Sequence, residues 1–174
     1  MLLYWSYQNL KGLTFIICGL LIIYFLPNIS SIINIPLYLF EPMRIIVVVS
    51  IIHSSKKGAY LLGLLLPLFS LILSNHPSVP KTFILIADLL LNVVLYFKLT
   101  KVYGNKFLCM SVSILLSKIM YYLIKYLFIK LSLIEGSFIA TPIYIQVIII
   151  MVLSTYVYLI AELSHSKKLS GNNN

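Results

Sequence analysis

Asp88 and Asn92 are polar residues inside an apolar run that extends from about residue 80 to 99. Because they are four residues apart, a helix places them on the same face. A carboxylate within a bilayer costs about 2.5 to 3.5 kcal/mol on insertion scales, so such a residue usually faces a cavity or a partner. We therefore interpret Asp88 first as a functional residue.

Other polar side chains interrupt three further apolar runs. Glu41 and Arg44 are three residues apart, so they share a helix face and can pair with each other. The remaining members of this set are Lys118, Tyr121, Tyr122, Lys125 and Gln146. A few placed polar groups of this kind are typical of a small-molecule pocket.

The composition is that of an integral membrane protein. Hydrophobic residues make up 61% of the 174 residues and charged residues only 10%, against about 25% in soluble domains. The net charge of +9 comes without a basic, aromatic-interleaved soluble region, so nucleic acid is excluded as a partner. Cys18 and Cys109 form no C-x-x-C pair and are expected to be packing residues.

The apolar runs predict an all-α membrane protein with six transmembrane helices, since about 17 to 25 residues cross a bilayer. The first run is expected to end at Pro27-Asn28, and the third contains Pro67. The expected spans are about 12–26, 36–53, 58–73, 80–99, 106–129 and 138–163. Residues 1–163 would form a single transmembrane domain, and the polar tail 164–174 is expected to be disordered.

Basic residues in the connections predict the orientation. Eight lie at the N-terminus, in the second and fourth connections and in the tail, and two lie on the opposite side. Lys- and Arg-rich short loops stay in the cytoplasm, so we expect both termini and the tail to be cytoplasmic. The polar break from Ser74 to Lys81, which contains Asn75 and His76, would then face outward. We expect the protein in the cell (inner, cytoplasmic) membrane.

With this orientation, the polar residues of the second, fourth, fifth and sixth spans share the outer half of the bilayer. That coincidence of depth favours a pocket open to the exterior. Structural alternatives stay open: Glu41 with Arg44, and Asp88 with Lys118, could be neutralising pairs that help helices pack. Lys125 could extend to the membrane boundary, Tyr121 and Tyr122 could pack within the bundle, and Asn75 and His76 could cap the third helix.

The sequence lacks the common marks of a membrane enzyme. There is no H-E-x-x-H, G-x-S-x-G or phosphate-binding loop, and the three histidines are too scattered for metal ligation. A single aspartate does not suit an aspartyl intramembrane protease. We expect neither enzymatic activity nor a cofactor, and any energised transport would take its energy from a partner.

Three stretches resemble the substrate-binding (S) components of energy-coupling factor (ECF) transporters. They are 58–70, 74–77 and 86–92, which resemble the third helix, the outer loop and the fourth helix of that family, where an acidic residue is followed four positions later by a small or amide residue. The length, the six spans and the cytoplasmic termini also resemble the family.

The resemblance implies capture of a vitamin or similar water-soluble micronutrient at the outer side. It also implies a complex with a transmembrane coupling subunit and two ATPase subunits in the lipid bilayer. Asn75 and His76 would belong to the outer loop that covers the pocket. The pocket itself would include Asp88, Asn92, Lys118, Tyr122 and Gln146, with Glu41 and Arg44 beside them.

Two other functions stay open. A small membrane scaffold resembling rod-shape-determining proteins would bind protein partners and tolerate substitution of the outer polar residues. A lipid-modifying enzyme would use Asp88 or Glu41 as a general base and turn over on its own. For the transporter hypothesis, three cations (Arg44, Lys118 and Lys125) against two carboxylates suit a zwitterion or a small anion, because unpaired charges in a low-dielectric pocket are costly.

Overall fold

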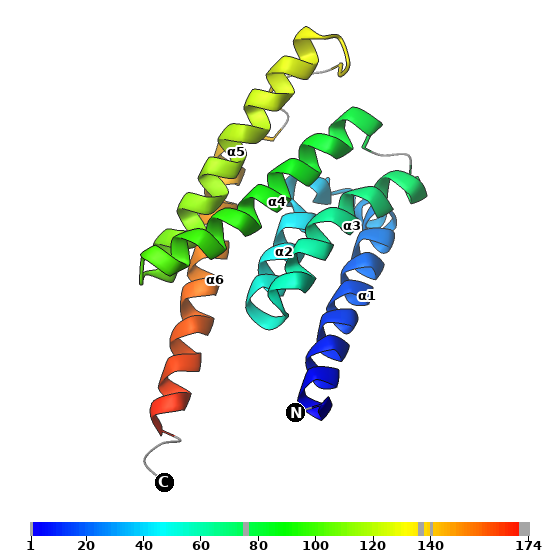
Figure 1. Ribbon diagram of the computed structural model, residues 1–174. Helices are drawn as coiled ribbons and strands as arrows, with labels where there is room; N and C mark the ends of the chain where they lie inside the picture. The colour runs from blue at the N-terminus through cyan, green and yellow to red at the C-terminus, as the bar shows by residue number, and fades with distance from the viewer. Residues whose placement is uncertain (1, 75–76, 136–137, 140, 171–174) are drawn as a thin grey trace.

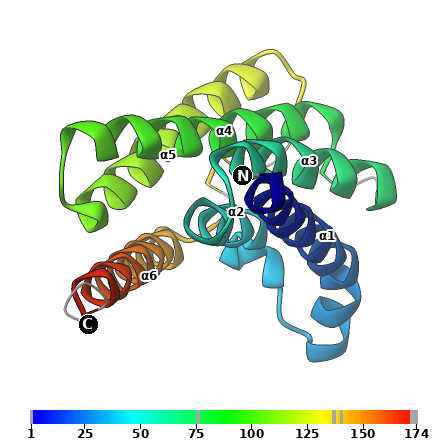
Figure 2. The same cartoon turned by 60° about the horizontal axis from the view of Figure 1, so that its bottom comes forward.

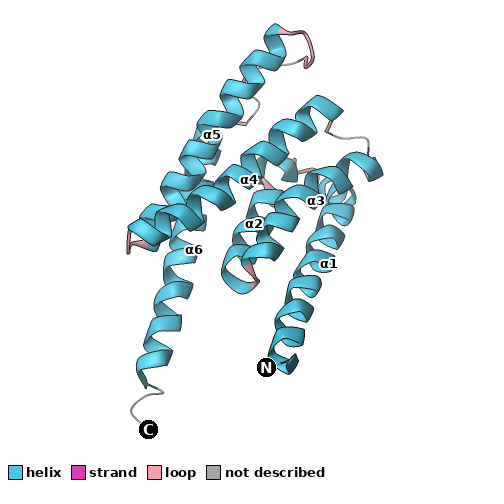
Figure 3. Cartoon of the chain, in the orientation of Figure 1, coloured by secondary structure: helices cyan, strands magenta, loops and turns pink. Residues whose placement is uncertain are grey.

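The computed structural model describes residues 2–74, 77–135, 138–139 and 141–170, and within these ranges the regular structure is entirely helical (Figure 3). In these described ranges, seven helices follow one another. They are α1 (Leu2–Ile33), the short 3-10 helix η1 (Leu37–Phe40), α2 (Pro42–His53), α3 (Lys56–Ser74), α4 (Val79–Val102), α5 (Lys106–Lys130) and α6 (Ile143–Ser170). The all-α prediction is therefore confirmed.

Five of these helices are long and apolar enough to cross a membrane: α1, α3, α4, α5 and α6. The protein is thus a multi-pass membrane protein. The stretch expected to form the second span is divided into η1 and α2 instead. Twelve residues of α2 extend only about 18 Å, which is less than the roughly 30 Å of a bilayer core.

Glu41 separates η1 from α2. Its backbone is left-handed, with φ of 51°, which ends η1, and Pro42 then occupies the first turn of α2, where no N–H donor is needed. The expected end of the first helix at Pro27 was wrong, because α1 continues through Pro27 to Ile33. Membrane helices tolerate an internal proline when neighbouring groups satisfy the freed carbonyl.

α2 lies at the centre of the molecule. It contacts α1, α3, α4 and α6, and Figure 2 shows it surrounded by these helices. Six of its twelve residues are buried, among them Arg44, Val47 and Val48. The apolar core extends from these valines to Leu62 and Leu66 of α3. Arg44 is therefore buried on the same helix as the core residues Val47 and Val48.

α4 and α5 pack against each other extensively, and α5 packs in turn against α6. Successive helices run in alternating directions, so the beginning of α1 and the end of α6 lie at the same end of the molecule (Figure 1). The connections α2–α3 and α4–α5 lie towards that end, and the connections α3–α4 and α5–α6 lie towards the other. α6 includes Ser164 to Ser170, a stretch for which the sequence predicts disorder.

Candidate functional site: a buried ionic network on three helices

Arg44 is the central residue of the site. Its side chain is 1% exposed, and its guanidinium group donates hydrogen bonds to three side chains. Nε donates to Glu41 Oε2 at 2.7 Å, Nη1 donates to Ser117 Oγ at 3.1 Å, and Nη2 donates to Asp88 Oδ2. The planar guanidinium carries five N–H donors, which suits it to bind several oxygen acceptors at once.

Glu41 extends the network to a second cation. Its Oε1 accepts a hydrogen bond from Lys118 Nζ, while its Oε2 pairs with Arg44. Two carboxylates and two basic groups therefore form a network with no net charge, which joins the start of α2 to α4 and α5. Balanced pairing is what allows four ionised groups to lie within a low-dielectric bundle.

The local backbone explains how these groups meet. The left-handed turn at Glu41 places its carboxylate at the start of α2, and Arg44 follows within the first turn on the same face. Asp88 lies on α4 and Lys118 on α5, and these two helices pack closely. Glu41 and Arg44 therefore face side chains of both α4 and α5.

One helical turn after Asp88, α4 carries another buried polar residue. Asn92 is 0% exposed, and its Nδ2 donates to Ser113 Oγ of α5 at 3.0 Å. Its Oδ1, like Asp88 Oδ1 one turn away, accepts no hydrogen bond from any described residue. The hydroxyl groups of Ser50 and Ser54 also lack a hydrogen-bond partner among the described residues. A buried acceptor left unpaired costs about 1 to 3 kcal/mol, so Asp88 Oδ1 and Asn92 Oδ1 favour a donor from elsewhere.

A second polar group lies where α5 ends and α6 begins. Gln146 Nε2 donates to Tyr122 OH at 2.6 Å and to the Thr141 carbonyl at 2.8 Å. Lys125 Nζ donates to the Phe138 carbonyl at 2.8 Å. These contacts tie the connection between the two helices to the side of α5.

Tyr121 lies between the network and this second group. The centroid of its ring is 5.4 Å from Lys118 Nζ and 5.9 Å from Lys125 Nζ, so two ammonium groups lie near one aromatic ring. The network and the second group are thus neighbours along α5.

The structure brings most of the predicted residues together. Glu41, Arg44, Asp88 and Lys118 form one network, Asn92 lies one turn from it, and Tyr122 pairs with Gln146. Asn75 and His76 lie outside the described residues. Glu41 pairs with Arg44, as their spacing allows, whereas Asp88 pairs with Arg44 and not with Lys118, which binds Glu41 instead.

Sequence reasoning did not identify Ser113 and Ser117. Both are fully buried on α5, and each accepts a hydrogen bond from the site, Ser113 from Asn92 and Ser117 from Arg44. Their spacing of four residues puts them on one helix face, and Lys118 follows directly. Small hydroxyl residues at this spacing inside an apolar helix were the available signal.

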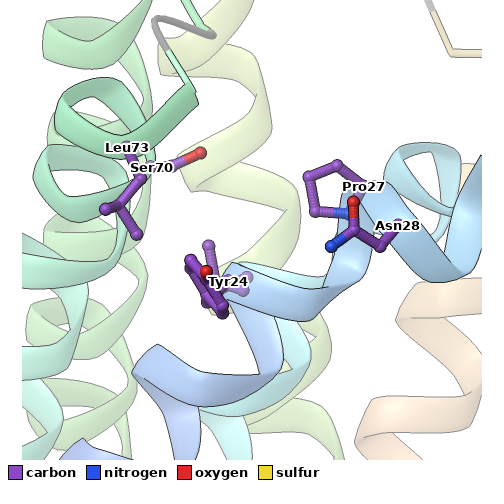
Figure 4. Close-up of a pocket in the computed structure, with 6 residues that line it drawn as sticks. Tyr24, Pro27, Asn28, Ser70 and Leu73 are labelled. Atoms are coloured by element: carbon purple, nitrogen blue, oxygen red, sulfur yellow. The ribbon is translucent and has the colours of Figure 1, made fainter.

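A cavity of about 270 Å³ lies elsewhere, between α1 and α3. Figure 4 shows Tyr24, Pro27 and Asn28 of α1 on one side of it and Ser70 and Leu73 of α3 on the other. None of these residues belongs to the predicted site.

Within the described part of the chain, no three histidine, cysteine or acidic residues lie close enough to hold a metal ion together. Comparisons with family models, with curated proteins and with solved structures find no match to this chain.

Proposed function

We propose that this chain is the membrane-embedded substrate-binding component of an uptake transporter of the ECF type. It would capture a small water-soluble micronutrient from the outer side and pass it on in a complex with a transmembrane coupling subunit and two ATPases. The observation that carries the proposal is the pair of buried oxygens on α4, Asp88 Oδ1 and Asn92 Oδ1, which accept no hydrogen bond from a described residue.

The physical reason is that a buried hydrogen-bond acceptor normally has a donor beside it. In a network that served packing alone, each buried acceptor would be expected to find a donor within the bundle, because an unpaired acceptor lowers stability. Here the donors of Arg44 are directed to Glu41, Ser117 and one oxygen of Asp88, and the amide donor of Asn92 is directed to Ser113. Two adjacent acceptors on one helix face thus remain for a solute that carries N–H or O–H groups.

The proposed orientation completes the mechanism. The termini and the connections rich in lysine would be cytoplasmic, so the start of α4 and the end of α5 would face outward. A solute would enter from that side and reach Asp88 about two to three turns into α4. The neutral ionic network would hold α2, α4 and α5 in place while the solute binds.

Native mass spectrometry of the protein, purified in mild detergent from cells grown in rich medium, tests this proposal. We expect one small molecule per chain in the wild type and its loss in Asn92→Leu, which removes the acceptor without changing any charge. Ser113→Ala is the matched control, since it removes the partner of Asn92 Nδ2 and leaves Asn92 Oδ1 in place. Ser113→Ala should retain the molecule.

Purification from the native host tests the partners. The proposal expects a coupling subunit and two ATPases to accompany the chain. A spectrum without any small molecule, combined with a co-purifying membrane or cytoskeletal scaffold protein, would contradict the proposal and favour the scaffold function.

A further inference from the structure

Lys125 is a buried cation without a carboxylate partner in the described part of the chain. It is 2% exposed and donates to the Phe138 carbonyl. The chain has four acidic residues, and ion pairs between described residues occupy only Glu41 and Asp88, which bind Arg44 and Lys118. Glu135 is exposed in the α5–α6 connection, and Glu162 lies near the other end of α6, beside Tyr158.

The charged group nearest to Lys125 along α5 is also a cation. The ammonium groups of Lys118 and Lys125 both contact the Tyr121 ring. Lys118 shares its one acidic partner, Glu41, with Arg44. Since the Arg44 network is already neutral, the surroundings of Lys125 keep an excess of positive charge. A buried cation in this position favours an anion beside it.

Aromatic rings line the same region. Tyr121 and Tyr122 are in edge contact with their centroids 5.2 Å apart, and the centroids of Tyr122 and Phe138 are 5.4 Å apart. The Tyr121 ring also contacts the ammonium groups of Lys118 and Lys125. Ring faces next to a positive group suit a planar ligand that carries an acidic substituent.

We propose that Lys125, with the rings of Tyr121 and Tyr122, is the subsite for a singly charged oxyanion, a carboxylate or a phosphate, on the transported solute. The inference rests on the proposed function and adds the charge class of the substrate to it. Lys125 and Lys118 are seven residues apart, so this subsite lies about 10 Å along α5 from the level of the ionic network. A solute that reaches both would carry an anionic group at one end and hydrogen-bond donors at the other.

Three variants separate charge recognition from a structural role. Lys125→Gln keeps an N–H donor for the Phe138 carbonyl but removes the charge, and Lys125→Arg keeps both. Lys130→Gln removes an exposed lysine from the same helix and is the matched control. Each full-length variant is purified by the procedure used for the wild type. Native mass spectrometry then identifies the bound molecule, and spectra in positive and negative ion mode show whether that molecule is a cation or an anion.

The same proteins are then titrated with benzoate, benzamide and benzamidinium, which share one planar shape and differ in charge, while the thermal midpoint is followed. We expect an anionic molecule that is lost in Lys125→Gln and retained in Lys125→Arg and Lys130→Gln. Benzoate alone should raise the midpoint, with at least a tenfold weaker apparent affinity in Lys125→Gln. Repetition in nanodiscs of phosphatidylcholine with and without phosphatidylglycerol identifies the source of the anion.

The outcomes distinguish the two proposals. A neutral or cationic bound molecule, or an anion that Lys125→Gln retains, overturns the anion subsite and leaves the proposed function intact. A bound phosphatidylglycerol that Lys125→Gln loses supports the subsite but assigns it to a lipid headgroup, which contradicts a water-soluble solute there. No bound molecule in any variant, together with no effect of benzoate, overturns both.

Discussion

Arg44 and Asp88 are opposite charges in a part of the bundle where both side chains are at most 3% exposed. In the described part of the chain Arg44 is the one ion-pair partner of Asp88, whereas Arg44 also pairs with Glu41. The isolated charge that remains after one partner is removed costs about 3 to 5 kcal/mol, whereas replacement of both by apolar residues is often neutral. The pair is therefore expected to show strong energetic coupling.

Asp88→Leu and Arg44→Leu should each lower the stability of the folded protein by about 3 to 5 kcal/mol, because each leaves a buried charge with fewer partners. The double variant should be more stable than either single one. Thermal unfolding in detergent checks this as a double-mutant cycle. Additive losses would show that the two residues act independently and would contradict the geometry of the network.

For contacts between individual residues, the sequence predicts pairs within a helix better than pairs between helices. The spacing of Glu41 and Arg44 sufficed to predict their contact, because three residues along a helix determine both depth and direction. Asp88 and Lys118 share a depth, yet depth does not determine how helices are rotated about their axes. The structure places the multi-donor guanidinium of Arg44 between Asp88 and Glu41, and the single ammonium group of Lys118 binds Glu41.

Among the elements, α1 depends on Gly19 for its close approach to the rest of the bundle. A Cβ atom at Gly19 would lie 2.8 Å from Ile46 Cγ2 of α2 and 3.2 Å from Leu62 Cδ2 of α3. Small residues let membrane helices pack closely in this way.

Gly19→Leu should therefore destabilise the protein by about 1 to 3 kcal/mol, the usual cost of overpacking. Cys18→Leu is the matched control, because Cys18 is adjacent but exposed and its new side chain would face the surroundings. Thermal midpoints of the two variants measure the difference. Equal midpoints would mean that α1 does not pack against α2 and α3 through Gly19.

The cap at the start of α5 offers a second test of how a single helix is stabilised. The Asn105 side chain accepts a hydrogen bond from the Leu108 N–H at 3.2 Å, which caps the helix. Asn105→Ala should cost about 1 kcal/mol, and Asn105→Asp, which keeps the acceptor, should cost little. Hydrogen exchange at Leu108 reports the loss directly, and unchanged exchange in Asn105→Ala would show that this cap contributes nothing.

The helices other than α2 were predictable from apolar run length, since a bilayer imposes about 20 apolar residues on each span. The division of η1 from α2 was not predictable in this way. Residues 36–53 read as one apolar run, whereas in the structure Glu41 has a left-handed backbone and binds Arg44 and Lys118. Pro27 misled the prediction for the converse reason, because a proline inside a membrane helix is tolerated.

For the whole molecule, the short central helix raises the question of how many times the chain crosses the membrane. Five long helices alone would place the termini on opposite sides, whereas the alternating directions in Figure 1 bring both ends of the chain to one end of the molecule. The two facts agree if η1 and α2 together return the chain across the bilayer in the protected centre of the bundle, where a span need not face lipid along its full length.

Single cysteines in a variant without Cys18 and Cys109 test this arrangement with a membrane-impermeant thiol reagent. Ser78→Cys and Gly104→Cys flank α4. Ser78 is exposed, and no atom lies within 4 Å of the Cβ that Gly104 would gain, so both changes should be tolerated. Tyr38→Cys and Lys57→Cys flank α2 in the same way, since both side chains are exposed.

We expect the reagent to label Ser78→Cys and Tyr38→Cys in intact cells, and to label Gly104→Cys and Lys57→Cys only after permeabilisation. The reason is that lysine-rich connections are retained in the cytoplasm. Labelling of Tyr38→Cys and Lys57→Cys from the same side would show that α2 does not return the chain across the membrane. The termini would then lie on opposite sides, and the network of Arg44 could no longer be placed in the outer half on the strength of the lysine distribution.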